Sequence, residues 1–299
     1  MQQTILLATL DGVATASVSF MVAVGLSLIF GIMRILNIAH GSFYAIGAYT
    51  AATLGMWLAG PDGGWLTYPI LLVAALLVGC TLGFVIERGL LQHIYGKEHS
   101  LQILITFGIF MMLEDFQKLV FGVEPYFYDA PLAMLGMIEV GGIYYTVYQL
   151  IVLPLMALAV MVALTLFFNR SKQGKLITVV IEDYEVATTL GINARKVYLV
   201  TFVLGAVLAA FGGALASSTT SLVPGIGADT IVLSFAIVAT AGLGHFQGAA
   251  ITALIIGLAH AFSVHLFSDF ASVMPYLVMT VVLLVKPYGL FGRPDVKRL

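Results

Sequence analysis

Long stretches of this sequence contain only apolar and small uncharged residues, and this feature limits the folds that the chain can adopt. Charge-free runs cover residues 70–86, 150–168, 198–216 and 273–285. The longer runs approach the roughly 20 residues of a spanning helix, and the shorter ones indicate tilted, broken or re-entrant segments. Because 61% of the residues are hydrophobic and 9% are charged, the chain cannot form the polar surface of a soluble domain. The sequence therefore predicts an all-α polytopic membrane protein.

Polar residues, glycines and prolines divide the chain into nine apolar segments. Their approximate bounds are 9–33, 37–59, 66–87, 101–122, 147–168, 198–219, 229–243, 247–268 and 271–286. The blocks around 229–268 are short and rich in glycine, so we expect eight or nine transmembrane segments that include broken or re-entrant helices. Residues 1–299 are expected to form a single transmembrane domain.

Lysine and arginine are distributed unevenly among the connections. Apart from Lys118, they gather at Arg34 and within residues 88–97, 170–196 and 286–298. Acidic residues without bases occupy the alternate connections, at Asp62, within 124–139 and at Asp269. The positive-inside rule then places 88–100, 169–197 and the C-terminus in the cytoplasm, and an odd number of crossings leaves the N-terminus outside. The net charge of −2 offers no basic surface for nucleic acid.

The cytoplasmic loop 169–197 contains a short amphipathic pattern, which predicts a single helix over residues 182–193. It has an acidic start (Glu182, Asp183, Glu185), an apolar side (Ile181, Val186, Ala187, Leu190) and a glycine stop (Gly191). Carboxylates stabilise the positive end of a helix dipole, and glycine is a common C-terminal stop. The apolar side must be buried against the protein's own spans, against lipid or in a partner's groove.

A polar stretch at residues 37–42 interrupts the apolar sequence and contains Asn37, His40, Gly41 and Ser42. At membrane depth, a helix that starts here leaves backbone N–H groups pointing into a cavity, where they can meet an anionic group such as a carboxylate. At the membrane surface, the same side chains would only cap the helix. We hypothesise that these residues border a solute path and that segment 37–59 is discontinuous at its start.

Two further polar groups lie in or beside the apolar segments. Residues 242–248, with His245 and Gln247, form a glycine-rich break that weakly resembles the first, as an inverted repeat would produce. Glu114, Asp115 and Lys118 lie inside segment 101–122, where charges normally face protein or water. The i,i+4 spacing of Glu114 and Lys118 predicts an ion pair, which either is structural or lines a polar vestibule.

The connection 123–146 is the longest of the acidic ones and is rich in tyrosine. Tyrosine is favoured at interfaces, so this loop suits the docking of a soluble partner. The alternative is a solvated loop that packs on the outer mouth of the protein.

Three stretches, in this order, resemble the branched-chain amino acid permeases of ABC importers, the LivH type. They are residues 25–49 with the core Asn37-Ile-Ala-His-Gly41, residues 181–193 ending in Gly191-Ile192-Asn193, and residues 242–249. The resemblance covers about residues 10–290, and within it 181–193 resembles the loop that couples such permeases to their ATPases. Glu114 and Asp115 depart from the uncharged polar residues expected there, which puts an ordinary branched-chain solute in doubt.

The resemblance implies an assembly in a bacterial cytoplasmic (inner) membrane. Its partners would be a second, homologous permease, two cytoplasmic ATPases and a periplasmic solute-binding protein. The sequence has no Gly-x-x-x-x-Gly-Lys-Ser/Thr loop, so ATP would bind to partner subunits, and we expect no cofactor, metal or catalytic residue in this chain. The solute would be a small amphipathic molecule, foremost a branched-chain or hydrophobic amino acid.

Two alternatives to this function remain open. The solute could be urea, an amide, a carboxylate or a sugar, because related permeases share this architecture. The chain could instead be an ion-coupled secondary transporter that uses Glu114 and Asp115. An intramembrane enzyme is disfavoured, since no Gly-x-Ser-x-Gly, His-Glu-x-x-His or paired-aspartate arrangement occurs.

Overall fold

The computed structural model describes residues 1–292, except for the side chain of Glu182, and nearly all of its regular structure is helical. The α-helices are α1 (Gln2–Met33), α2 (His40–Leu58), α3 (Thr67–Gly89), α4 (His99–Phe121), α5 (Ala130–Ala133), α6 (Leu153–Arg170), α7 (Lys172–Glu182), α8 (Tyr184–Thr189), α9 (Ala194–Ala216), α10 (Ile226–Ala241), α11 (Phe246–Leu266) and α12 (Met274–Val285). A π-helical turn (Tyr148–Val152) precedes α6, and β1 (Met137–Val140) pairs with β2 (Ile143–Thr146) as an antiparallel hairpin.

The predicted all-α membrane class is confirmed. Each of the nine apolar segments corresponds to a helix, and the helices of five of them are long and apolar enough to cross a membrane. These candidate spans are Gln2–Met33, Thr67–His93, Tyr148–Arg170, Ala194–Ala216 and Phe246–Leu266. The shorter helices α10 and α12 are also apolar.

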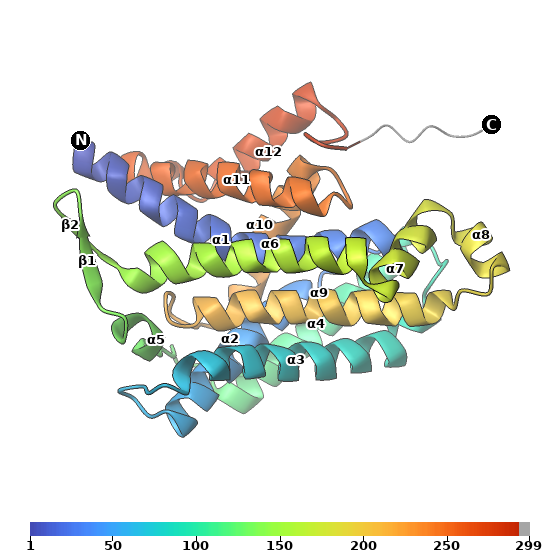
Figure 1. The fold of residues 1–299 in the computed structure, drawn as a ribbon, viewed down its shortest axis with the longest axis horizontal. Helices are drawn as coiled ribbons and strands as arrows, with labels where there is room; N and C mark the ends of the chain where they lie inside the picture. Colours follow the sequence, from blue (N-terminus) through green and yellow to red (C-terminus); the bar gives the residue numbers. More distant parts are fainter. Residues whose placement is uncertain (293–299) are drawn as a thin grey trace.

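The long helices lie side by side along the longest axis of the molecule (Figure 1). Helix α1 packs along α9 and α11, and α9 also packs along α2 and α3, so α1 and α9 form the centre. One end of the bundle carries the N-terminus, α5 and the β-hairpin, and we call it the hairpin end. The opposite end carries α7 and α8, and we call it the α8 end.

Successive connections alternate between these two ends. At the hairpin end, the Tyr68 hydroxyl donates to the carbonyl oxygen of Pro131 over 3.0 Å, which joins the start of α3 to the loop after α4. At the α8 end, the ring of Tyr198 lies 5.1 Å from that of Tyr95, which joins α9 to the connection 90–98. The basic connections identified in the sequence therefore share one end, and the acidic connections share the other.

Two helices start inside the bundle rather than at its ends. Helix α2 begins at His40, whose Nε2 lies 3.0 Å from the carbonyl oxygen of Val22 in the middle of α1. Helix α10 begins at Ile226, and its Gly227 packs directly against Gly41 of α2. Glycine is required at this crossing because a Cβ on Gly227 would lie 2.9 Å from the carbonyl oxygen of Gly41.

The two chain segments that lead to this crossing come from opposite ends. Residues 34–39 come from the α8 end, where Arg34 lines a cavity together with Ile181 of α7. Residues 217–225 come from the hairpin end, where Leu222 forms a β-bridge with Tyr126. The two segments thus lead α2 and α10 into the interior of the bundle from different ends.

The close crossing predicts a large difference between two glycine-to-alanine substitutions. In Gly41→Ala the new Cβ would overlap the carbonyl oxygen of Gly227, and overpacking of this kind costs about 1–3 kcal/mol. We expect the apparent unfolding temperature of the detergent-solubilised protein to fall by about 3–10 °C.

The matched control is Gly108→Ala in α4, where an added Cβ meets no atom within 4 Å. Alanine favours a helix over glycine, so the control should be unchanged or slightly more stable. Equal melting temperatures in the two variants would show that α2 and α10 do not cross at Gly41.

Candidate functional site

A cavity of about 390 Å³ lies between α1, α10 and α11 in the half of the bundle nearest the hairpin. Its polar lining is mostly hydroxyl groups, from Thr15, Ser19, Thr219, Thr220, Thr230 and Ser234. Its ionisable lining residues are Asp11, His260 and His265, and its apolar walls include Val18, Val22, Leu153, Leu233 and Val264. A pocket of this size with mixed lining suits a small amphipathic molecule.

Helix α1 places one polar edge on this cavity because Asp11, Thr15 and Ser19 are spaced four residues apart. Side chains at i, i+4 and i+8 lie on the same helix face. This spacing within an otherwise apolar helix was the sequence signal that could have identified the site, and the sequence analysis missed it. The remaining polar groups come from separate elements that only the tertiary fold brings together.

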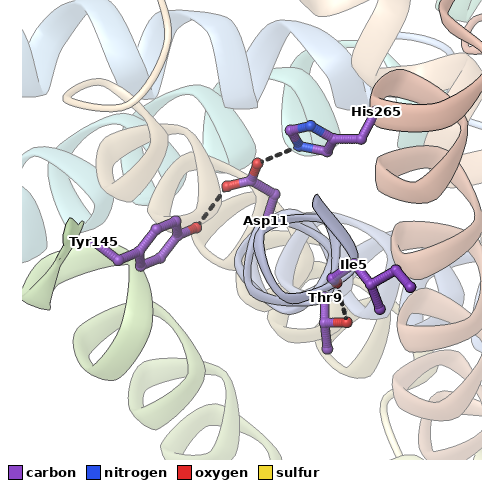
Figure 2. Close-up of polar contacts among 5 residues, drawn as sticks. All are labelled: Ile5, Thr9, Asp11, Tyr145 and His265. Carbon is purple, nitrogen blue, oxygen red and sulfur yellow. Dashed lines mark hydrogen bonds and ion pairs between the residues drawn. The ribbon is translucent and has the colours of Figure 1, made fainter. Parts of the chain in front are cut away.

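Asp11 joins three elements at the edge of the cavity, as Figure 2 shows. The Tyr145 hydroxyl of β2 donates to Asp11 Oδ1 over 2.7 Å, and Nε2 of His265 in α11 lies 2.7 Å from Asp11 Oδ2. Burial and the hydrogen bond to the Asp11 carboxylate raise the pKa of Tyr145, so its hydroxyl keeps its proton and donates. The contact therefore connects the hairpin to the cavity wall.

The residues predicted to border a solute path lie at the crossing of α2 and α10 and not in the cavity itself. Asn37 and His40 are fully buried, and Ser42 is 3% exposed. Both amide atoms of Asn37, Nδ1 of His40 and Oγ of Ser42 have no hydrogen-bond partner among the described residues. Gly41 forms the contact with Gly227. One turn further along α2, Tyr44 does line the cavity.

The predicted ion pair between Glu114 and Lys118 in α4 is confirmed, and Asp115 joins it as a third charged residue. Lys118 Nζ lies 3.2 Å from Glu114 Oε1 and 3.2 Å from Asp115 Oδ1. Asp115 points outward with a 72% exposed side chain. Glu114 shares only a void of about 10 Å³ with Ser42 and Gly227, which is roughly the space of one water. The carboxylate thus lies near the starts of α2 and α10, away from the 390 Å³ cavity.

His245 and Gln247 line a second cavity of about 290 Å³ at the α8 end. The His245 ring stacks on Phe291, and its Nδ1 accepts a hydrogen bond from the backbone N–H of Gly248 over 3.1 Å. His245 therefore caps the start of α11, which gives it a structural task.

The predicted coupling helix is wrong in its bounds. Residues from Glu182 onward do not form one helix, because Asp183 adopts an extended backbone and separates α7, which ends at Glu182, from α8, which begins at Tyr184. Asp183 Oδ1 accepts from the N–H of Val186 over 3.0 Å, and Glu185 lies in the first turn of α8. Asp183 thus caps a helix as expected, whereas Glu182 ends the preceding one, and the capped helix is shorter and starts later.

The rest of this segment agrees with the sequence analysis. Gly191 ends α8 with a φ of +80°, and Ile192 then donates its N–H to the carbonyl of Ala187 over 3.0 Å. Asn193 caps α9 by accepting from the N–H of Lys196 over 3.2 Å. Ala187 is buried, while Val186 and Leu190 lie on one side of this segment and are each more than half exposed, so that apolar side is uncovered.

Comparison with known proteins gives matches over almost the whole chain. Residues 8–284 match the family described as branched-chain amino acid transport system / permease component. The chain is 30% identical over 297 residues to the high-affinity branched-chain amino acid transport system permease protein LivH of Escherichia coli (strain K12), which covers 97% of this chain and 96% of that protein. No solved structure matches the chain.

Two further relatives carry related names. The permease protein BraD of Pseudomonas aeruginosa is 28% identical over 296 residues, with 97% of this chain and 96% of the relative covered. The permease protein LivM of Escherichia coli (strain K12) is 26% identical over 310 residues, with 97% of this chain and 72% of the relative covered. The chain thus resembles two differently named permeases of one organism.

The geometry predicts which engineered cysteines react with a small polar methanethiosulfonate in a Cys80→Ser background. The cysteine in Thr15→Cys would line the cavity, whereas the cysteine in Ser42→Cys would be buried at the crossing of α2 and α10. Because a buried thiol reacts only after local opening, Ser42→Cys should react at least about tenfold more slowly in the resting protein.

Both rates would be measured by mass spectrometry of intact protein. Equal rates would show that the crossing is already open. Acceleration of Ser42→Cys during solute or ATP turnover would place residues 37–42 in the moving path, and protection in every state would remove them from it.

Proposed function

This chain belongs to the family of permease components of branched-chain amino acid transport systems, and on that basis we propose that it is one permease subunit of an ATP-driven importer for branched-chain or other hydrophobic amino acids. The observation that carries the proposal is the 390 Å³ cavity inside a bundle of apolar helices. Its hydroxyl groups and single carboxylate can bind the polar end of an amino acid, while Val18, Leu233 and Val264 can hold an apolar side chain.

The partners follow from the family and from what this chain lacks. The similarity to both LivH and LivM supports a pair of homologous but different permeases. The family supports two cytoplasmic ATPases that bind ATP, and the sequence agrees in having no phosphate-binding loop of its own. A periplasmic solute-binding protein would deliver the solute to the hairpin end, where residues 123–146 are acidic and rich in tyrosine.

We propose that the bundle crosses a bacterial cytoplasmic membrane as one domain, with eight or nine crossings. The basic connections at the α8 end support a cytoplasmic position for that end, and the acidic hairpin end would then face the periplasm with the N-terminus. Helices α2 and α10, entered from opposite ends and meeting at Gly41 and Gly227, support an inverted repeat of α1–α2 and α9–α10.

Helix α8 is proposed as the element that docks on the ATPase. It lies outside the candidate spans and yet exposes Val186, and Leu190 directly after it on the same side, an arrangement that fits an amphipathic helix in a partner's groove. The ring of Tyr184 stacks on Tyr198 at 6.4 Å, and Tyr198 contacts Tyr95 at 5.1 Å. Motion of α8 would thus be passed to α9 and to the α3–α4 connection together.

An ion-coupled carrier that uses Glu114 and Asp115 has less support. Both carboxylates lie 3.2 Å from Lys118, and neither lines the 390 Å³ cavity. An ATPase-docking helix would also have no task in such a carrier.

The proposed function predicts ATP-dependent uptake. The chain, co-expressed with the homologous permease and ATPases of its source and reconstituted in proteoliposomes with the binding protein, should accumulate radiolabelled L-leucine only when ATP and binding protein are present. Co-purification of ATPase subunits in mild detergent is expected as well. Leucine uptake that follows an ion gradient without ATP would contradict the assignment.

The docking proposal predicts a difference between two substitutions that add the same charge to α8. Val186→Glu places a carboxylate on the apolar side, whereas Thr188→Glu places it about 200° around the helix. Because a charge buried at an interface core is disfavoured, Val186→Glu should reduce ATPase co-purification and leucine uptake by about tenfold.

The control Thr188→Glu should remain near wild type in both measurements, and both variants should insert normally because α8 lies outside the candidate spans. Wild-type ATPase association in Val186→Glu would mean that α8 does not enter the ATPase groove.

A further inference from the structure

The charge inside the cavity is unbalanced. Asp11 contributes a carboxylate, and no lysine or arginine lines the cavity in the part of the chain that the structure describes. When histidine is counted as neutral, the lining residues carry a formal charge of −1. A pocket of one sign concentrates ligand groups of the other sign and repels those of its own. The cavity therefore favours a solute that bears an ammonium group over a purely anionic one.

Asp11 lies where a solute can reach it from the hairpin end. Helix α1 has 32 residues. At 1.5 Å per residue it is about 48 Å long, which exceeds the roughly 30 Å hydrocarbon layer. Asp11 comes about 14 Å from the helix start, near the boundary of that layer. Its side chain is 33% exposed, so the carboxylate stays in contact with water.

The carboxylate of Asp11 has unused hydrogen-bond acceptor sites. An ionised carboxylate has about four acceptor sites, and each Asp11 oxygen has one partner, Tyr145 or His265. His265 is held within α11, whereas Tyr145 belongs to the hairpin outside the bundle. The Tyr145 hydroxyl is a neutral donor, and an ammonium group makes stronger, charge-assisted hydrogen bonds to the same oxygen.

The rest of the cavity lining offers complementary groups for the other parts of an amino acid. The hydroxyl groups of Ser19 and Ser234 can donate to a carboxylate, and Val18 and Leu233 form part of the apolar wall. A zwitterion with an apolar side chain would satisfy all three surfaces. A neutral sugar or urea would leave the Asp11 charge without a counter-ion.

From these contacts we propose that Asp11 is the specificity-determining residue that binds the ammonium group of the solute. When the cavity is empty, the Tyr145 hydroxyl donates its hydrogen bond to the same carboxylate. His265 is a positioning residue that fixes the orientation of the carboxylate. The assignment rests on the proposed function, since it takes the cavity to be the solute site of an amino acid permease.

The reconstituted importer tests the assignment with three variants. Asp11→Asn keeps the shape and can still accept from Tyr145 but loses the charge, so the maximal leucine uptake rate should fall by about 10–100-fold. Asp11→Glu keeps the charge and should retain more activity than Asp11→Asn. Tyr145→Phe removes only the competing hydroxyl and should change the rate by no more than about threefold.

If Asp11 has only a structural role, the variants should rank in the reverse order of leucine uptake rate. If the carboxylate only fastens the hairpin, Asp11→Asn is mild and Tyr145→Phe is at least as damaging, and that result overturns the proposal. ATPase co-purification and basal ATP hydrolysis show whether each variant assembles.

A binding measurement keeps the assignment testable if Asp11→Asn fails to assemble or if the proposed function fails. In a Cys80→Ser, Thr15→Cys protein, L-leucine and 3-methylbutylamine should slow thiol modification, because both bear an ammonium group. The acid 4-methylpentanoate, which has the same side chain without the ammonium, should not. Equal protection by the acid refutes the role of Asp11, whereas absence of wild-type leucine uptake refutes only the proposed function.

Discussion

A helix that starts inside a bilayer must find partners for its first backbone N–H groups within the protein, and the rest of this structure depends on how that requirement is met. Helices α2 and α10 both start inside the bundle and meet at Gly41 and Gly227, where the absence of side chains lets the two backbones touch. Polar groups with unused hydrogen-bonding capacity, on Asn37, His40 and Ser42, gather at the same level. The central crossing is therefore tightly packed in space and incompletely satisfied in hydrogen bonding.

This crossing also explains where the open space lies. Close contact of glycine-bearing helices leaves only the void of about 10 Å³ at the crossing itself, and the larger cavity lies in the half of the bundle toward the hairpin, between α1, α10 and α11. The polar lining comes from short side chains, mainly serine and threonine, which leave room for a solute while supplying donors. A closed centre with a cavity on one side is the arrangement expected of a permease that exposes its solute site to one compartment at a time.

The sequence predicted the features that depend on neighbouring residues. The apolar segments, the Glu114–Lys118 pair and the stop at Gly191 are local, and the structure agrees with each. The coupling helix was placed too early because the sequence pattern did not reveal that Asp183 is extended and caps a second helix. The cavity was missed because its lining comes from several separate elements, and only the polar edge of α1 could be read in advance. The residues of the first break remain a prediction as a solute path.

The row of three contacting tyrosines at the α8 end has a thermodynamic consequence. Tyr184, Tyr198 and Tyr95 connect the exposed helix to the central helix α9, which also packs along α1, the helix that carries Asp11. If this contact path transmits a shift in either direction, the coupling free energy is the same from both sides. Solute in the cavity must then change the affinity for the ATPase by the factor by which the docked ATPase changes the affinity for solute. In such a permease the ATPase would sense whether solute is bound as strongly as it influences the binding of that solute.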